Sequence, residues 1–149
     1  MKRILLSGLF AALLFGALPL AAHEHKPPHH GTLVRFGDEF AHLELVLDPA
    51  AGRLTAYALD GEAEKPVRLK ARSIAIWVKP LKPAGQPFTL SLMAVANPLT
   101  GETKGDTSEF TASASRLEGL ADFDGKVQDL RIRGSRFRAV GFNYPKGNE

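Results

Sequence analysis

Cysteine is absent from the 149 residues of this chain, and methionine, tryptophan and tyrosine are scarce. Without cysteine, neither a disulfide framework nor a thiolate metal site can form. A transition-metal site would therefore have to use imidazole, carboxylate, thioether or backbone nitrogen ligands. Histidine has only five copies, and four of them fall between His23 and His30.

Long apolar runs are also absent, except at the N-terminus. Two basic residues precede an apolar stretch over residues 4–20, and the small pair Ala21 and Ala22 follows. This pattern is typical of a secretory signal peptide over residues 1–22, with an uncleaved membrane anchor as the alternative. Cleavage after either alanine fits the pattern. We therefore expect a periplasmic protein that touches the membrane only through its signal segment before cleavage.

Neither sign of charge dominates once such a leader is removed. Two of the 19 Lys and Arg residues are Lys2 and Arg3, so the charge of the remainder falls to 17 minus 16, or +1. This balance gives no reason to expect a nucleic-acid partner. The remaining length predicts a flexible His-rich arm over residues 23–31 and a single domain over residues 32–149.

No segment after Gly31 carries an apolar stripe at helical spacing. Short segments of alternating polarity are separated by turn residues instead, which predicts an all-β domain. The number of strands favours an antiparallel two-sheet sandwich, immunoglobulin-like in broad architecture, over a barrel. The expected strands cover residues 32–36, 40–48, 53–59, 67–70, 73–78, 88–94, 109–113, 127–133 and 136–142.

The stretch HEHKPPHHG holds the densest group of candidate metal ligands. His23, His25, His29 and His30 lie close together in the sequence, and imidazole suits both copper and zinc. The alternative is a solvated arm whose histidines bind metal only weakly.

The cleavage site decides which geometry the first two histidines can offer. If cleavage follows Ala22, His23 becomes the first residue and His25 the third. The free amine, two backbone nitrogens and the His25 ring can then form a square-planar set, which suits Cu(II) and not Zn(II). Cleavage after Ala21 would remove this geometry.

A second candidate ligand pair lies in the segment EFAHLELVLD. His42 and Glu44 share one face of an expected strand, about 6.6 Å apart along it. If the His-rich arm folds back over this face, it can add further ligands. The alternative is that His42 is a hydrogen-bonded residue of the sheet. Because His42 is the only histidine available for a Ser-His-Asp arrangement in the domain, we expect no enzymatic activity.

The segment LRIRGSRFRA predicts a β-hairpin with a two-residue turn at Gly134 and Ser135. In that register Arg133 opposes Arg136, and Arg131 opposes Arg138, all on one face. Like charges opposite each other destabilise a strand pair. We therefore expect either acidic neighbours or a patch that binds phosphate, a lipid headgroup or an acidic partner. The candidate acidic neighbours are Glu39, Glu44 and Asp48.

Two stretches together, HEHKPPHHGTLV and DEFAHLELVLDPAAGRLTAYALDGEAEKPV, carry a family resemblance. They resemble small bacterial periplasmic proteins whose start is similar to the His-Gly-containing extracytoplasmic domain of some heavy-metal efflux adaptors. The matched positions are His29, His30 and His42, and Thr32 stands where that pattern has a second glycine. The resemblance implies a free-standing module of the metal-handling kind. Together with the histidines of the arm, it leads us to expect a module that binds copper or zinc and buffers it or passes it on. Its partner would be an efflux adaptor or another envelope protein.

Overall fold

The computed structural model describes residues 26–148, so His23, His25 and the expected signal segment lie outside the described residues. The described part is all-β, as expected, and contains no helix long and apolar enough to cross a membrane. Its elements in chain order are β1 (Thr32–Phe36), β2 (Ala41–Asp48), β3 (Arg53–Leu59), β4 (Ser73–Lys82), β5 (Phe88–Ala94), β6 (Glu109–Ser113), the 3-10 turn η1 (Ser115–Leu117), β7 (Asp122–Ile132) and β8 (Ser135–Tyr144).

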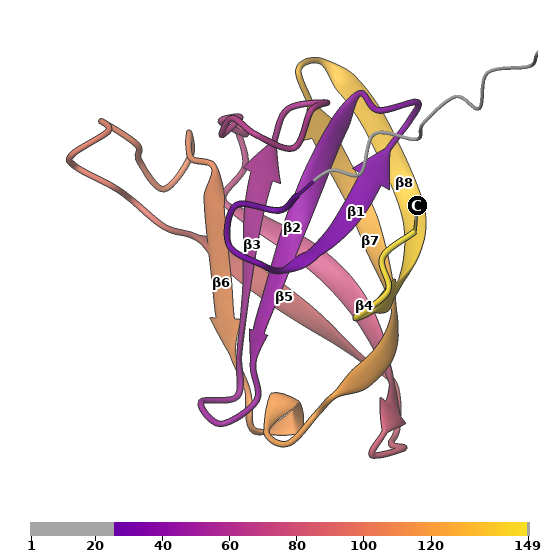
Figure 1. Ribbon diagram of the computed structural model, residues 1–149. Coiled ribbons are helices and arrows are strands. Elements are labelled where there is room, and N and C mark those ends of the chain that lie inside the picture. Colours follow the sequence, from indigo (N-terminus) through magenta and orange to yellow (C-terminus); the bar gives the residue numbers. More distant parts are fainter. Residues whose placement is uncertain (1–25, 149) are drawn as a thin grey trace, which may run out of the picture.

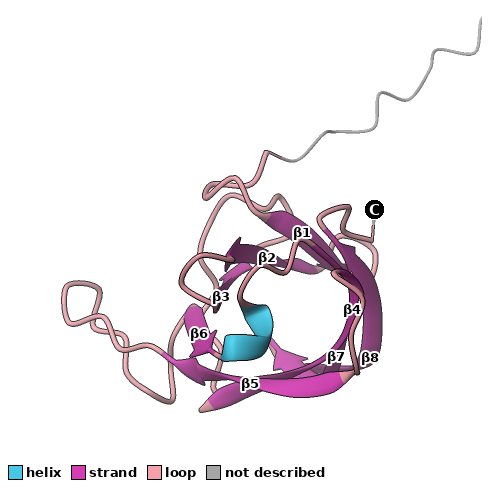
Figure 2. Ribbon diagram, turned by 90° about the horizontal axis from the view of Figure 1, so that it is seen from below, coloured by secondary structure: helices cyan, strands magenta, loops and turns pink. Residues whose placement is uncertain are grey.

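The eight strands form one antiparallel sheet in the order β1-β2-β3-β6-β5-β4-β7-β8. The sheet curls until β1 and β8 approach each other, so that it nearly closes into a barrel (Figure 2). The two-sheet sandwich is not confirmed. The physical reason is β6, which pairs with β3 on one side and β5 on the other and so joins the two halves into one sheet.

Alternating side chains place the core inside this curled sheet. In β4, for example, Ile74, Ile76 and Val78 are fully buried, whereas Trp77 lies on the outer face with Lys126 over its ring. The 3-10 turn η1 lies at one end of the barrel, seen in front in Figure 2, and buries Leu117.

The link between β3 and β4 covers the other end of the barrel (Figure 1). Val67 and Leu69 alternate inward from this link and are buried. The expected strand over residues 67–70 is nevertheless wrong, because the link forms only isolated bridges, such as that between Leu69 and Thr107. The link bridges the end of β3 through Pro66 and the segment before β6 through Leu69, but it forms no continuous ladder with either. Alternation alone therefore did not identify its role.

The turn of the β7–β8 hairpin differs from the expected one. Ile132 pairs with Ser135, so the turn residues are Arg133 and Gly134, and both have positive φ, 47° and 86°. Two such residues in sequence form the turn that matches the right-handed twist of the strands. The turn therefore moves by one residue and each cross-strand partner by two, so that Arg131 faces Arg136 while Arg138 faces an aspartate, Asp129.

Side chains from the C-terminal segment close the remaining gap between β1 and β8. The Asn148 carboxamide accepts a hydrogen bond from the Arg35 N–H at 2.7 Å and donates to the Arg35 carbonyl at 3.2 Å. It also donates to the Gly141 carbonyl of β8 at 3.2 Å. On the inner side, Phe137 of β8 packs edge-on against Phe36 of β1. We call this the seam of the barrel.

Candidate functional site

The His-rich arm meets the sheet at Glu44, whose side chain is fully buried. Because Leu43 and Leu45 point into the core, Glu44 projects from the outer face of β2. One carboxylate oxygen accepts hydrogen bonds from the backbone N–H groups of His29 at 2.7 Å and Gly31 at 2.8 Å. The other oxygen lies 2.8 Å from His29 Nδ1. The arm therefore folds back over this face, a possibility that the sequence left open.

The His29 ring is fixed on both its edge and its face. It stacks on Tyr57 of β3, with ring centroids 3.7 Å apart and an angle of 11° between the planes. Because a carboxylate only accepts hydrogen bonds, Nδ1 carries the proton that bridges to Glu44. In the neutral ring, the lone pair is then on Nε2. Burial, and next the charges of Glu109 and Glu44, raise the pKa of the Tyr57 hydroxyl, so the ring beneath His29 stays a neutral phenol.

Position 31 has no room for a residue larger than glycine, because the arm lies close against β2 here. A Cβ atom at this position would lie 2.5 Å from the Leu45 carbonyl oxygen and 2.9 Å from the Glu44 side chain. The preceding residue, His30, has a φ of 58°, is exposed, and donates its N–H to the Pro27 carbonyl at 3.1 Å. The tight turn at His30 thus places the N–H groups of His29 and Gly31 on one buried carboxylate.

His42 and Glu44 share a strand face as expected, but they bind different groups. His42 is fully buried, and its Nδ1 donates to the backbone carbonyl of Asp60 at 3.1 Å. The histidine that bonds to Glu44 is His29 of the arm. Within residues 26–148, no three His, Asp or Glu side chains lie close enough to hold a metal ion together. Any metal centre at the arm would need ligands from outside the described residues.

On the β7–β8 hairpin, two of the four predicted arginines are paired internally. Arg136 binds Asp129 through Nε at 2.9 and 3.0 Å and also through Nη2, while Arg138 lies 3.8 Å from the same carboxylate. The hydrogen bonds from Arg136 hold the pKa of Asp129 below its usual value. Sequence reasoning missed this partner because the misplaced turn hid which residue Arg138 faces.

The acidic neighbours expected from the sequence make other contacts. Glu44 binds the arm, and Asp48 pairs with Arg53 at 3.2 Å. Asp129 is also closer in sequence than either of them, two residues before Arg131 on the same strand face. That spacing is the signal that could have found it.

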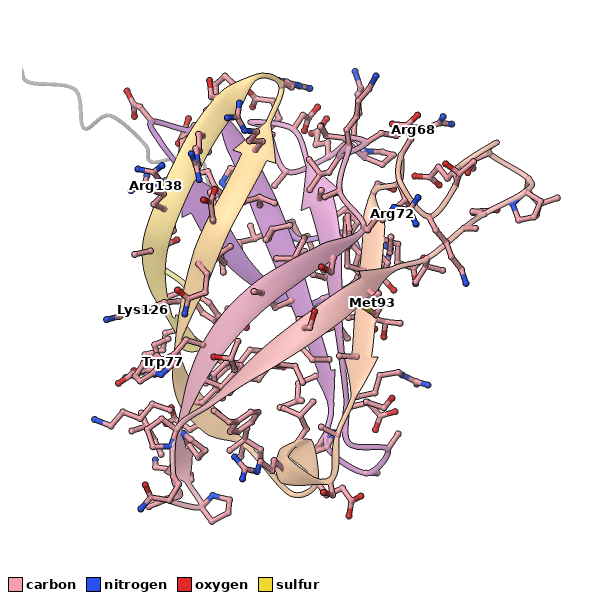
Figure 3. The ribbon with its side chains drawn as sticks, turned by 180° about the vertical axis from the view of Figure 1, so that it is seen from behind. Arg68, Arg72, Trp77, Met93, Lys126 and Arg138 are labelled. Atoms are coloured by element: carbon pink, nitrogen blue, oxygen red, sulfur yellow. The ribbon has the colours of Figure 1, made fainter. Side chains whose placement is uncertain are left out.

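The other two arginines, Arg131 and Arg133, line a pocket of about 300 Å³ at the end of the hairpin. Its remaining lining residues are Arg68, Leu69, Lys70 and Gly134. We call this space the basic pocket, because it is lined by four cations and by no carboxylate. Figure 3 shows Arg68 on the side of the molecule where the link enters β4, with further cations, Arg138 and Lys126, exposed on the same view.

The link's contribution to the basic pocket was not predicted from the sequence, although a signal for it is present. Between Glu64 and Glu102 the chain has no carboxylate. The six cations of this interval are Lys65, Arg68, Lys70, Arg72, Lys79 and Lys82. An uncompensated run of this kind indicates a cationic surface, but only the fold shows that it meets the hairpin.

Comparisons of the chain with protein-family models, with curated proteins and with solved structures gave no match. The resemblance to the extracytoplasmic domain of efflux adaptors therefore stays a prediction. The chemistry of the two sites, the His29–Glu44 pair and the basic pocket, has to be judged from their geometry.

Proposed function

We propose that this protein is an exported module that binds a divalent transition metal, copper or zinc, through the histidines of its arm. The observation that carries the proposal is the bond between the buried Glu44 carboxylate and His29 Nδ1 at 2.8 Å. A carboxylate behind one ring nitrogen fixes the tautomer and raises the basicity of the other, and metal-binding histidines commonly have such a partner. The His29 side chain is 44% exposed, so its second nitrogen is accessible to an ion.

In this proposal Glu44 positions a ligand, whereas the sequence alone suggested that it binds the metal directly. Its two oxygens already accept three hydrogen bonds from the arm. The metal ligands would be His29 with the exposed His30 beside it, completed by His23 and His25 from the start of the arm. Such a module would buffer the metal or deliver it to an efflux adaptor or another envelope protein.

Zinc titration of the protein beginning at His23 tests the role of His29. We expect His29→Ala to lower the Zn(II) affinity strongly and Glu44→Gln to lower it by about ten- to a hundredfold, because the supporting carboxylate is lost. His42→Ala is the matched control, since this buried imidazole bonds to the backbone carbonyl of Asp60. Competition with a chromophoric chelator measures the affinities. Equal Zn(II) binding by the wild type and by His29→Ala would contradict the proposal.

Copper adds a separate test, because it can use the backbone at the new terminus. With His23 first and His25 third, one Cu(II) should bind orders of magnitude more tightly than Zn(II), and binding should strengthen as pH rises because backbone amides lose protons. One residue added ahead of His23 should abolish this tight site. A tight copper site in the extended protein would instead assign copper to His29 and His30.

A further inference from the structure

The basic pocket lies at the end of the barrel, where the β3–β4 link meets the turn of the β7–β8 hairpin. We propose that the basic pocket binds a phosphate monoester group. This site does not depend on the metal proposed for the arm. It retains the anion-binding idea for the arginine hairpin but assigns it to a different set of residues.

The cations of the basic pocket are poorly compensated. Within the described part of the chain, Lys70, Arg131 and Arg133 form no ion pair within 4.0 Å, and Arg68 has one at 3.7 Å with Asp106. At longer range Arg133 interacts with Asp60, Arg131 with Asp129 and Arg68 with Glu102, but none of these carboxylates lines the pocket, and Lys70 has no such partner among these interactions. Like charges brought together in this way destabilise the folded protein unless an anion joins them.

The backbone that carries these cations is rigid. Leu69 is 1% exposed, and its N–H and carbonyl both bond to Thr107, at 2.8 and 3.3 Å. This anchor turns the flanking Arg68 and Lys70 outward. Arg131 belongs to the paired part of β7, and Arg133 is fixed in the turn. Anion binding therefore needs no backbone rearrangement, although the exposed arginine and lysine side chains still lose rotamer freedom when they bind.

The number and kind of donors favour a phosphate monoester over a carboxylate. Three arginines and one lysine line one small space, and guanidinium groups bind phosphate oxygens in pairs. The Arg68 guanidinium also donates to the Thr100 carbonyl, so it would reach a ligand only with its remaining donors. A phosphate monoester carries close to two negative charges near neutral pH and offers three terminal oxygens. A carboxylate offers one charge and two oxygens, so it would leave most of these cations unmatched.

Titration with inorganic phosphate, followed by NMR of backbone amides, tests the site. We expect saturable shifts confined to residues 68–70 and 131–134, and at least a tenfold weaker response to acetate at the same ionic strength. The double variant R131Q/R133Q should lose these shifts. The matched control is R136Q/R138Q, which removes the same charge but only from the arginines next to Asp129. Urea midpoints confirm that both variants fold.

Vesicles distinguish the two sources of the phosphate group. Phosphatidylcholine vesicles with phosphatidic acid present a monoester, whereas those with phosphatidylglycerol, at a fraction chosen to match the surface charge, present a diester. Binding to the first type alone, lost in R131Q/R133Q, assigns a lipid headgroup. Phosphate binding in solution without vesicle binding assigns a free phosphate-bearing molecule. Shifts spread over all exposed cations, or equal losses in both double variants, would overturn the site and leave the metal proposal unaffected.

Discussion

A single buried carboxylate determines how the arm meets the sheet. Burial of an isolated carboxylate is very costly, so a side chain like that of Glu44 persists only when its oxygens are matched by donors. All three donors come from the arm, two of them from the backbone of His29 and Gly31. Glu44 therefore couples the stability of the fold to the position of a candidate metal ligand.

The substitution Glu44→Gln should lower the free energy of unfolding by about 2–3 kcal/mol, because a neutral amide accepts fewer and weaker hydrogen bonds from these donors. Urea unfolding measures the change. Glu64→Gln, at an exposed position, is the control and should change stability by less than about 0.5 kcal/mol. An equally small effect at Glu44 would mean that the arm does not depend on this carboxylate.

The connection between β5 and β6 extends furthest from the barrel (Figure 1). The side chain of Glu102 links several residues of this loop by hydrogen bonds. Glu102 accepts hydrogen bonds from the Ser108 N–H at 2.8 Å, the Ser108 hydroxyl at 2.6 Å and the Thr100 hydroxyl at 2.6 Å. Burial alone would raise the pKa of Glu102, but these hydrogen bonds and the charge of Arg68 lower it below its usual value.

This lowered pKa predicts an acid-sensitive loop. Because the carboxyl group is more acidic in the folded protein, its contribution to stability is complete above the ordinary pKa of 4.5 and is lost as pH falls through the lower folded value. NMR titration should show the Ser108 amide shifting in that low-pH range. In Glu102→Gln, the same amide should shift much less with pH. An unchanged titration of Ser108 in the variant would show that another group is responsible.

At the scale of the whole molecule, the sequence predicts the elements better than their assembly. The bounds of β1, β3, β5 and β6 agree with the expected segments, because alternation of polarity is a local property. The pairing of β6 with β3 joins residues far apart in the chain, and alternation of polarity carries no information about such pairs. The sequence therefore did not predict that all strands form one sheet. The same limit applied to the basic pocket: Arg131 and Arg133 were candidates, but Arg68 joins them only through the fold.

The seam gives a prediction at this scale. Asn148→Ala removes the three hydrogen bonds that connect the C-terminal segment to Arg35 and Gly141. We expect a loss of about 1–3 kcal/mol of stability and faster hydrogen exchange at the Arg35 amide, because that N–H loses its partner. Lys146→Ala, at an exposed position nearby, should leave both unchanged. Unaltered exchange at Arg35 would show that the Asn148 side chain does not close the seam.

The position of β6 between β3 and β5 also governs the order of folding. As the chain is synthesised from its N-terminus, β1, β2 and β3 can pair at once, but the free edge of β3 has no partner until residues 60–108 have followed. During that interval the edge can pair with other chains, which is the usual origin of misassembly in β proteins. Because this pairing is long-range, it is also expected to limit the folding rate to milliseconds or slower. The five residues of β6 thus control how long the newly made chain remains open to such pairing.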